Sequence, residues 1–93
     1  MWDCELYETA RIRAEEASHY WAHTRPDGTH WSVLSSQLQG ENLAKGYYTA
    51  EEAVAAWLAS DGHRENILRE FSRGAIFFYE ADNGWFWCNH FGY

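Results

Sequence analysis

The 93-residue sequence has one proline, two cysteines and few basic residues, and it has no long apolar run. No stretch approaches the roughly 20 apolar residues that a membrane-spanning helix needs. The first five residues, Met1 to Glu5, are acidic in character and lack the basic-then-apolar layout of a signal peptide. Seven basic against fourteen acidic residues give a net charge of −7. Because nucleic acid is itself polyanionic, it is not expected as a partner.

The two cysteines are too few for a disulfide scaffold and lack the close spacing of metal ligands. A single disulfide between Cys4 and Cys88 would close a long loop and stabilise the fold by about 4–5 kcal/mol on the chain-entropy model. Alternatively, both residues are separate buried thiols. The sequence leaves these two interpretations open.

What the sequence does contain is typical of one globular domain over residues 1–93. Hydrophobic residues make up 46% of the chain and aromatic residues 18%. Large aromatic rings bury much surface, which compensates for the short length of the chain. There is no repeat, charge block or flexible linker.

Small and apolar side chains recur at spacings of three and four in the first quarter of the chain, namely Leu6, Ala10, Ala14, Ala17 and Trp21. This period predicts a helix over residues 3–22 with one buried stripe and with Glu and Arg on its other faces. The helix should end before Pro26, because a residue that precedes proline avoids helical angles. Residues 25–28 are typical of a turn, and residues 29–40 are interpreted as an ordered loop.

A second helix is predicted to begin at Thr49, which forms a capping box with Glu52. Its expected buried stripe consists of Ala53, Val54, Trp57 and Leu58. Ser60 is expected to end that helix and to cap a third one over roughly residues 61–69. The third helix is expected to bury Ile67 and Leu68.

The last part of the chain predicts a β-hairpin. Residues 75–79 and 85–91 are rich in aromatics and are separated by Asp82-Asn83-Gly84, which favours a tight turn. Helices followed by a hairpin predict an α+β fold with helices packed on an antiparallel sheet.

Five histidines in an acidic chain indicate a polar site. His19 and His23 stand four residues apart on the first predicted helix, a spacing that can place two imidazoles on one metal ion. The Glu of a His-Glu-x-x-His zinc motif is missing between them, so the alternative is that one of the pair faces solvent. His30 and His90 lie beside aromatics and are interpreted as packing or surface residues.

Three segments are more informative when taken together: residues 23–28 (HTRPDG), 40–44 (GENLA) and 57–68 (WLASDGHRENIL). In this order and spacing they resemble the CAP superfamily (cysteine-rich secretory proteins, antigen 5 and plant pathogenesis-related proteins). The likeness is to its bacterial branch of sperm-coating-protein-like (SCP-like) extracellular domains. It continues through Trp2-Asp3 in the first predicted helix and through Trp87 and Phe91-Gly92 at the end.

The resemblance implies a three-layer α-β-α sandwich whose central cleft carries two His and two Glu. In several members of the family the two His bind a divalent metal such as zinc. Carried over by motif, the first His is His23, the Glu of the second segment is Glu41, and the second His is His63. Ser60 stands where the family has its second Glu, and Glu65 does not match that position. The family's usual first helix would precede Trp2-Asp3, so the sandwich is expected to lack it.

The three retained residues suit a metal-capable cleft. His63 is expected in the first turn of its helix, where the positive end of the dipole disfavours protonation and leaves the imidazole able to bind metal. His23 is expected in the last turn of its helix, where the dipole favours the charged form. Glu41 could offset the charge of a metal or orient one imidazole. The alternative is a closed polar cleft in which Glu41 bridges the two His.

The first functional hypothesis is an extracellular or cell-envelope CAP-type binding module for a small-molecule, lipid, sterol, peptide or envelope ligand. The second is a metal-assisted hydrolase with His23 and His63 as ligands and Glu41 as base, although nothing in the sequence supplies a nucleophile. The third is a structural domain with a vestigial cleft.

Overall fold

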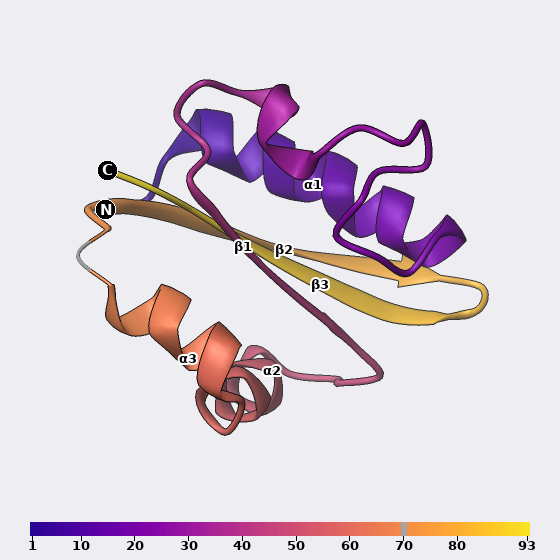
Figure 1. Cartoon of the computed structure of the whole chain (residues 1–93). Coiled ribbons are helices and arrows are strands. Elements are labelled where there is room, and N and C mark those ends of the chain that lie inside the picture. Colours follow the sequence, from indigo (N-terminus) through magenta and orange to yellow (C-terminus); the bar gives the residue numbers. More distant parts are fainter. Residues whose placement is uncertain (70) are drawn as a thin grey trace.

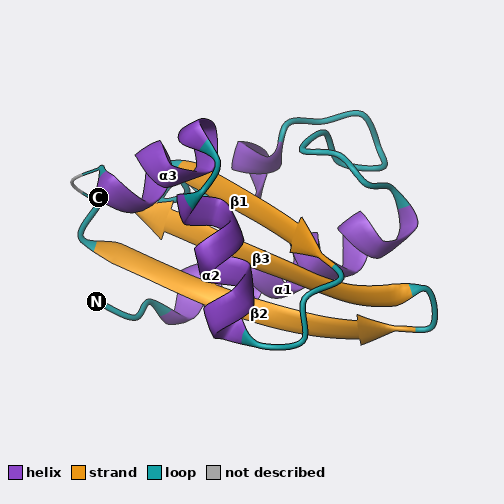
Figure 2. Cartoon of the chain, turned by 90° about the horizontal axis from the view of Figure 1, so that it is seen from below, coloured by secondary structure: helices purple, strands orange, loops and turns teal. Residues whose placement is uncertain are grey.

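The computed structural model describes residues 1–69 and 71–93 and has three layers (Figure 1). Helix α1 (Cys4–His19) packs on one face of a sheet, and helices α2 (Ala50–Leu58) and α3 (Asp61–Leu68) lie on the other. The strands are β1 (Gly40–Lys45), β2 (Arg73–Ala81) and β3 (Gly84–Gly92). Their order is β1-β3-β2 and both pairings are antiparallel, so β1 and β2 form the edges (Figure 2). The predicted α+β class and sandwich architecture are confirmed.

Helix α1 begins at a side-chain cap and buries the predicted stripe. The carboxylate of Asp3 accepts a hydrogen bond from the Leu6 N–H at 3.0 Å, which satisfies one unpaired donor of the first turn. The four stripe residues up to Ala17 are buried, but the helix ends at His19 rather than at residue 22. Trp21 is therefore outside the helix and 44% exposed. The expectation that His23 feels the dipole of this helix is wrong.

Strand β1 lies where the sequence did not predict one. The segment 29–40, interpreted as a loop, instead contains a short 3-10 helix, η1 (Trp31–Leu34), and the first residue of β1. In β1, Glu41 pairs with His90 and Leu43 pairs with Cys88. Because successive side chains of a strand point to opposite faces, Glu41 and Leu43 lie on the α1 side and Asn42 lies on the side of α2 and α3.

The predicted hairpin is confirmed, and both of its strands are longer than predicted. Ala81 pairs with Gly84, so Asp82 and Asn83 form a two-residue loop. Gly84 has φ of +141°, a conformation that side chains rarely adopt, which explains why glycine stands at this position.

The predicted start of α2 is confirmed. The hydroxyl of Thr49 accepts from the Glu52 N–H at 3.1 Å. Only half of the expected capping box forms, because the Glu52 carboxylate accepts from the Thr49 hydroxyl instead of from its N–H. Ser60 occupies the cap position of α3, but its side chain does not cap the helix. Leu58 and Leu68, expected to be buried, are 40% and 70% exposed.

Two hydrophobic layers hold the helices to the sheet. The layer under α1 consists of Ala10, Ala14, Ala17, Leu43, Phe86 and Cys88. The layer under α2 includes Trp57, which is buried and donates its indole N–H to the Leu43 carbonyl at 2.9 Å. Cys4 is exposed and Cys88 is buried, and both are free thiols. The disulfide considered from the sequence is therefore excluded. Among the described residues, no helix has the length and apolarity to cross a bilayer.

Candidate metal centre

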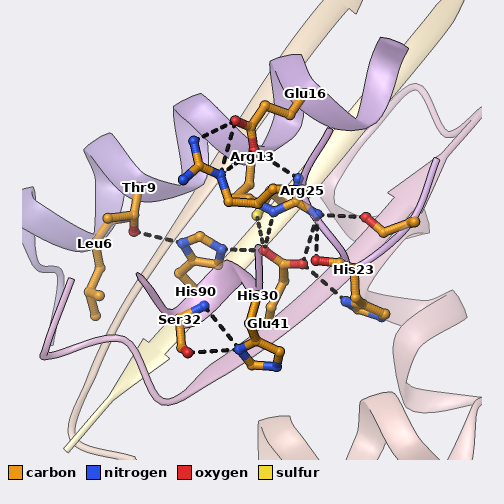
Figure 3. A network of polar contacts seen from close by, with 12 residues as sticks. Leu6, Thr9, Arg13, Glu16, His23, Arg25, His30, Ser32, Glu41 and His90 are labelled. Atoms are coloured by element: carbon orange, nitrogen blue, oxygen red, sulfur yellow. Dashed lines mark hydrogen bonds and ion pairs between the residues drawn. The ribbon is translucent and has the colours of Figure 1, made fainter. Parts of the chain in front are cut away.

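The carboxylate of Glu41 is fully buried between the sheet and α1 (Figure 3). It accepts four hydrogen bonds from nitrogen donors and a weaker one from the Cys88 thiol at 3.9 Å. Arg13 binds both oxygens, with Nε 3.0 Å from Oε2 and Nη2 3.2 Å from Oε1. Nδ1 of His23 lies 3.0 Å from Oε1, and Nε2 of His90 lies 2.7 Å from Oε2. Burial alone would raise the pKa of Glu41, but the hydrogen bonds from His23, His90 and Arg13 lower it to about 2. The group is therefore ionised at neutral pH.

Arg13 is a fully buried side chain that the sequence analysis placed on an outer face of the helix. Besides Glu41, its guanidinium donates to the Glu16 carboxylate at 3.0 Å and to the backbone carbonyls of Ala22 and His23 at 2.6 and 3.2 Å. Arg13 thus holds both the backbone of His23 and the carboxylate that binds the His23 ring. Its position three residues after Ala10 puts it beside the apolar stripe, which is the one sequence feature that points to its burial.

His90 is the partner of Glu41 that the sequence analysis did not select. Its ring is fully buried, and burial lowers its pKa despite the carboxylate. A carboxylate can only accept, so we assign the proton of neutral His90 to Nε2. Nδ1 then accepts from the Thr9 hydroxyl, 2.6 Å away, although that hydroxyl is also within 3.0 Å of the Leu6 carbonyl.

His23 lies four residues beyond the end of α1, in the segment held by Arg13. Its side chain is 52% exposed, and Nδ1 donates to Glu41. The other ring nitrogen, Nε2, has no hydrogen-bond partner among the described residues. His19 is the last residue of α1, so His19 and His23 are not one turn apart on a single helix, and that expected arrangement is wrong.

His63 lies in the first turn of α3 and is partly buried. Its Nδ1 is 3.1 Å from the hydroxyl of Ser60, which explains why that hydroxyl does not cap the helix. Burial, and then the nearby charge of His23, lower the pKa of His63. The backbone of His63 is tied to the sheet, because its carbonyl accepts from the side-chain amide of Asn42 at 3.1 Å.

A groove of about 340 Å³ opens beside His63 at the outer edge of β1. Its lining residues are Trp21, Leu43, Ala44, Lys45, Tyr47, Ala56, Trp57, Ser60 and His63. Two sequence candidates lie outside the cleft. His30 bonds Ser32 on the surface, and Glu65 is exposed on α3.

A second group of possible ligands is buried under α1. One ligand atom each of Glu41, Cys88 and His90 lies within 4.8 Å of the others, so this group could hold a metal ion. Burial and the charge of Glu41 raise the pKa of the Cys88 thiol well above its ordinary value. A cation here would also compete with the Arg13 guanidinium, which already neutralises the carboxylate.

A small antiparallel sheet between helical layers is the architecture that the CAP resemblance implies. The buried Glu41 binds His23, and His63 lines the groove at the edge of β1. The profile of the CAP family, described as the Cysteine-rich secretory protein family, matches residues 1–91. The chain belongs to this family.

Two known proteins are similar to the chain. "Uncharacterized protein YkwD" of Bacillus subtilis (strain 168) is 34% identical over 92 residues, and the match covers 89% of this chain. The chain spans 36% of the length of that relative. The solved structure of an outer surface protein from Borrelia burgdorferi superposes with a TM-score of 0.80 at 23% identity. The superposition covers 98% of this chain and 74% of that chain, and it shows a shared fold.

Proposed function

We propose that this CAP domain is a binding module whose cleft holds a divalent metal such as zinc on His23 and His63. One observation carries the proposal: each imidazole is held through Nδ1, His23 by Glu41 and His63 by Ser60. Because a carboxylate can only accept, the neutral ring of His23 has its lone pair on Nε2. For His63 we assign the tautomer in which the Ser60 hydroxyl accepts from Nδ1, which leaves Nε2 free in the same way. An oxygen partner on the second nitrogen is the usual way in which proteins orient a metal-binding histidine.

The donor set fits zinc. Neutral imidazole nitrogen is a preferred zinc ligand, and the lowered pKa of His63 favours the neutral form. Ser60 stands where the family resemblance implies a second Glu, and it makes the same kind of contact to its histidine as Glu41 makes to His23. A metal bound here would supply positive charge and open coordination positions to a ligand in the adjacent groove.

Two other hypotheses from the sequence have less support. Glu41 already accepts bonds from Arg13, His23 and His90, so no lone pair remains to take a proton from water. The metal-assisted hydrolase would therefore need another base. In the closed-cleft alternative Glu41 bridges His23 and His63, but the second imidazole that Glu41 binds is that of His90.

The proposed place of action is outside the cell or in its envelope. The support is the resemblance to secreted SCP-like domains and the structural neighbour, which is itself an outer surface protein. The ligands that suit such a module are a small molecule, a lipid or a peptide.

Calorimetric titration of zinc into the purified chain tests the metal site. We expect saturable binding at pH 7.5 that weakens as the pH falls through about 6.5, where histidines take up protons. His23→Ala and His63→Ala should abolish binding, and Ser60→Ala should weaken it by about tenfold. The exposed His19→Ala variant is the matched control and should bind like the parent. Absence of binding in the parent, or binding that survives both cleft substitutions, would refute the metal site.

A further inference from the structure

The outer edge of β1 presents backbone groups that face away from the sheet. Gly46 N–H donates to the Trp85 carbonyl, so even-numbered residues of this segment bond to β3. Since backbone groups of a strand alternate in direction, those of Glu41, Leu43 and Lys45 point outward. Figure 2 shows β1 as an outer strand with no further strand beside it.

Only part of this edge is satisfied within the chain. The Glu41 carbonyl accepts from Asn66 and the Leu43 carbonyl accepts from the Trp57 indole. Within residues 1–69 and 71–93, no group accepts from the N–H of Leu43 or Lys45, and none donates to the Lys45 carbonyl. Leu43 is buried, and buried backbone groups are rarely left without partners, whereas the backbone groups of exposed Lys45 are open to solvent. This part of the edge can therefore pair with an added strand.

The cleft groove runs along this same edge. Leu43, Ala44 and Lys45 line it from the strand, Trp21 lines it from the segment after α1, and the remaining lining residues come from Tyr47, α2, Ser60 and α3. A volume of about 340 Å³ beside a strand edge is enough for a few residues of extended chain.

The charge of the groove is opposite to that of the molecule. Lys45 is the only lysine in a chain of net charge −7, and its ammonium lies 4.7 Å from the centre of the Trp21 ring. No described carboxylate pairs with it, and the groove lining contains no Asp or Glu. The Lys45 ammonium at the groove therefore suits an anionic acceptor such as a carboxylate.

We propose that the groove binds the carboxyl-terminal segment of an extended peptide, which adds as a strand to the free edge of β1. Peptide carbonyls accept from the N–H groups of Leu43 and Lys45, and the terminal carboxylate contacts the Lys45 ammonium. The occupant is a peptide because the N–H groups of Leu43 and Lys45 lie two residues apart on one strand edge, which is the spacing at which carbonyls of an added strand accept. Strand addition is a common mode of peptide recognition. The Leu43 carbonyl between them keeps its bond to the Trp57 indole. The inference rests on the proposed function in using the same cleft, but the strand pairing does not need the metal.

The other sheet edge is a poorer site for a carboxylate. Ile76, Phe78 and Glu80 of β2 also turn their backbone groups outward, but they include an acid and no base. Gly74 of β2 is already paired with the backbone of Met1 and Asp3. The cation at this end of β2, Arg73, is engaged by Gln37 and Asp3. The β2 edge therefore serves as the internal comparison in the test.

The experiment follows the backbone amides of the ¹⁵N-labelled chain by NMR in the presence of EDTA. The probe is acetyl-Thr-Val-Thr-Val with a free carboxylate, titrated to millimolar concentration, and the same peptide with a carboxamide end. We expect the Leu43 and Lys45 amides to shift and to exchange more slowly with solvent. The carboxamide peptide should bind up to about fivefold more weakly, as expected for loss of an exposed charge pair.

Two pairs of variants locate the peptide. Lys45→Gln should weaken binding of the free-acid peptide to the level seen for the carboxamide peptide. Arg11→Gln makes the same charge change at a surface ion pair on α1 and should leave peptide binding unchanged. Ala56→Phe fills the groove and should block binding, whereas Ala55→Phe lies on the exposed side of the same helix and should not. If Ala56→Phe fails to fold, the Lys45→Gln variant, which changes an exposed residue, still tests whether the peptide carboxylate binds at the groove.

Several results would overturn the inference: no shifts at millimolar peptide, shifts centred on the β2 edge, or equal binding of the two peptides. The zinc titration is independent of this experiment. A chain that binds zinc but not peptide would refute the strand addition and leave the metal site, and the reverse result would refute only the metal site.

Discussion

Glu41→Gln removes the charge at the centre of the buried network and keeps the shape of the side chain. The carboxylate and the guanidinium of Arg13 are both fully buried, so the substitution leaves a buried cation without its partner. Breaking a buried ion pair from one side costs about 3–5 kcal/mol. For a domain of this size each kcal/mol lowers Tm by roughly 4–8 °C, so we expect a fall of at least about 12 °C.

The pH dependence of stability gives a second measure of the same interaction. The folded-state pKa of Glu41 is about 2, against 4.5 for the ordinary group. Because it is depressed, its stabilisation is fully present above pH 4.5 and is lost as the pH falls through 2. The difference corresponds to about 3 kcal/mol. The Glu41→Gln variant should lack this part of the acid destabilisation, so its stability should depend less on pH over that range.

Urea denaturation of the parent and the variant between pH 2 and pH 7 measures both effects. Glu8→Gln is the matched control, because Glu8 is an exposed acid paired with Arg11, and it should change stability by less than about 1 kcal/mol. The double variant Arg13→Met/Glu41→Leu should lose less stability than the two single variants lose in sum, because it removes both buried charges at once and leaves neither without its partner. A Glu41→Gln variant that is as stable as the parent at pH 7, with an unchanged pH profile, would show that the network does not stabilise the fold.

The remaining predictions concern one helix end and the two thiols. Thr49→Ala removes the acceptor for the Glu52 N–H and should cost about 1 kcal/mol, seen as a lower urea midpoint, and an unchanged midpoint would contradict the cap. A thiol reagent should modify Cys4 in the native chain but Cys88 only after unfolding, because burial both shields Cys88 and raises its pKa. Mass spectrometry that finds two labels on the folded protein would show that Cys88 is accessible.

The features predicted correctly from the sequence are those with a local cause. The hairpin follows from a tight turn between two aromatic runs, and the start of α2 follows from the hydroxyl of Thr49. The family motifs also selected Glu41, which the structure places at the centre of a network.

The features that could not be predicted depend on partners far along the chain. Strand β1 shows no alternation of apolar and polar residues, because α2 and α3 contact it on one face and Leu43 packs against α1 on the other. The sequence after His19 contains no glycine or proline that would end α1 there, and Arg13 instead fixes the chain beyond the helix by binding the carbonyls of Ala22 and His23. His90 is 49 residues from the carboxylate that it binds, and no local pattern reports that contact.

Strand β1 connects the two helical layers through consecutive residues. Glu41 is bonded to Arg13 of α1, and Asn42 is bonded to His63 and Asn66 of α3 on the opposite face. Inserting or deleting one residue before Glu41 would turn each side chain to the wrong face, so both layers would lose their polar anchors at once. The length of the chain between η1 and β1 is thus tied to both layers, whereas the exposed residues 26–28 make their described hydrogen bonds only within their own turn. Variation in length during evolution should therefore concentrate in such turns and avoid the segment that leads into β1.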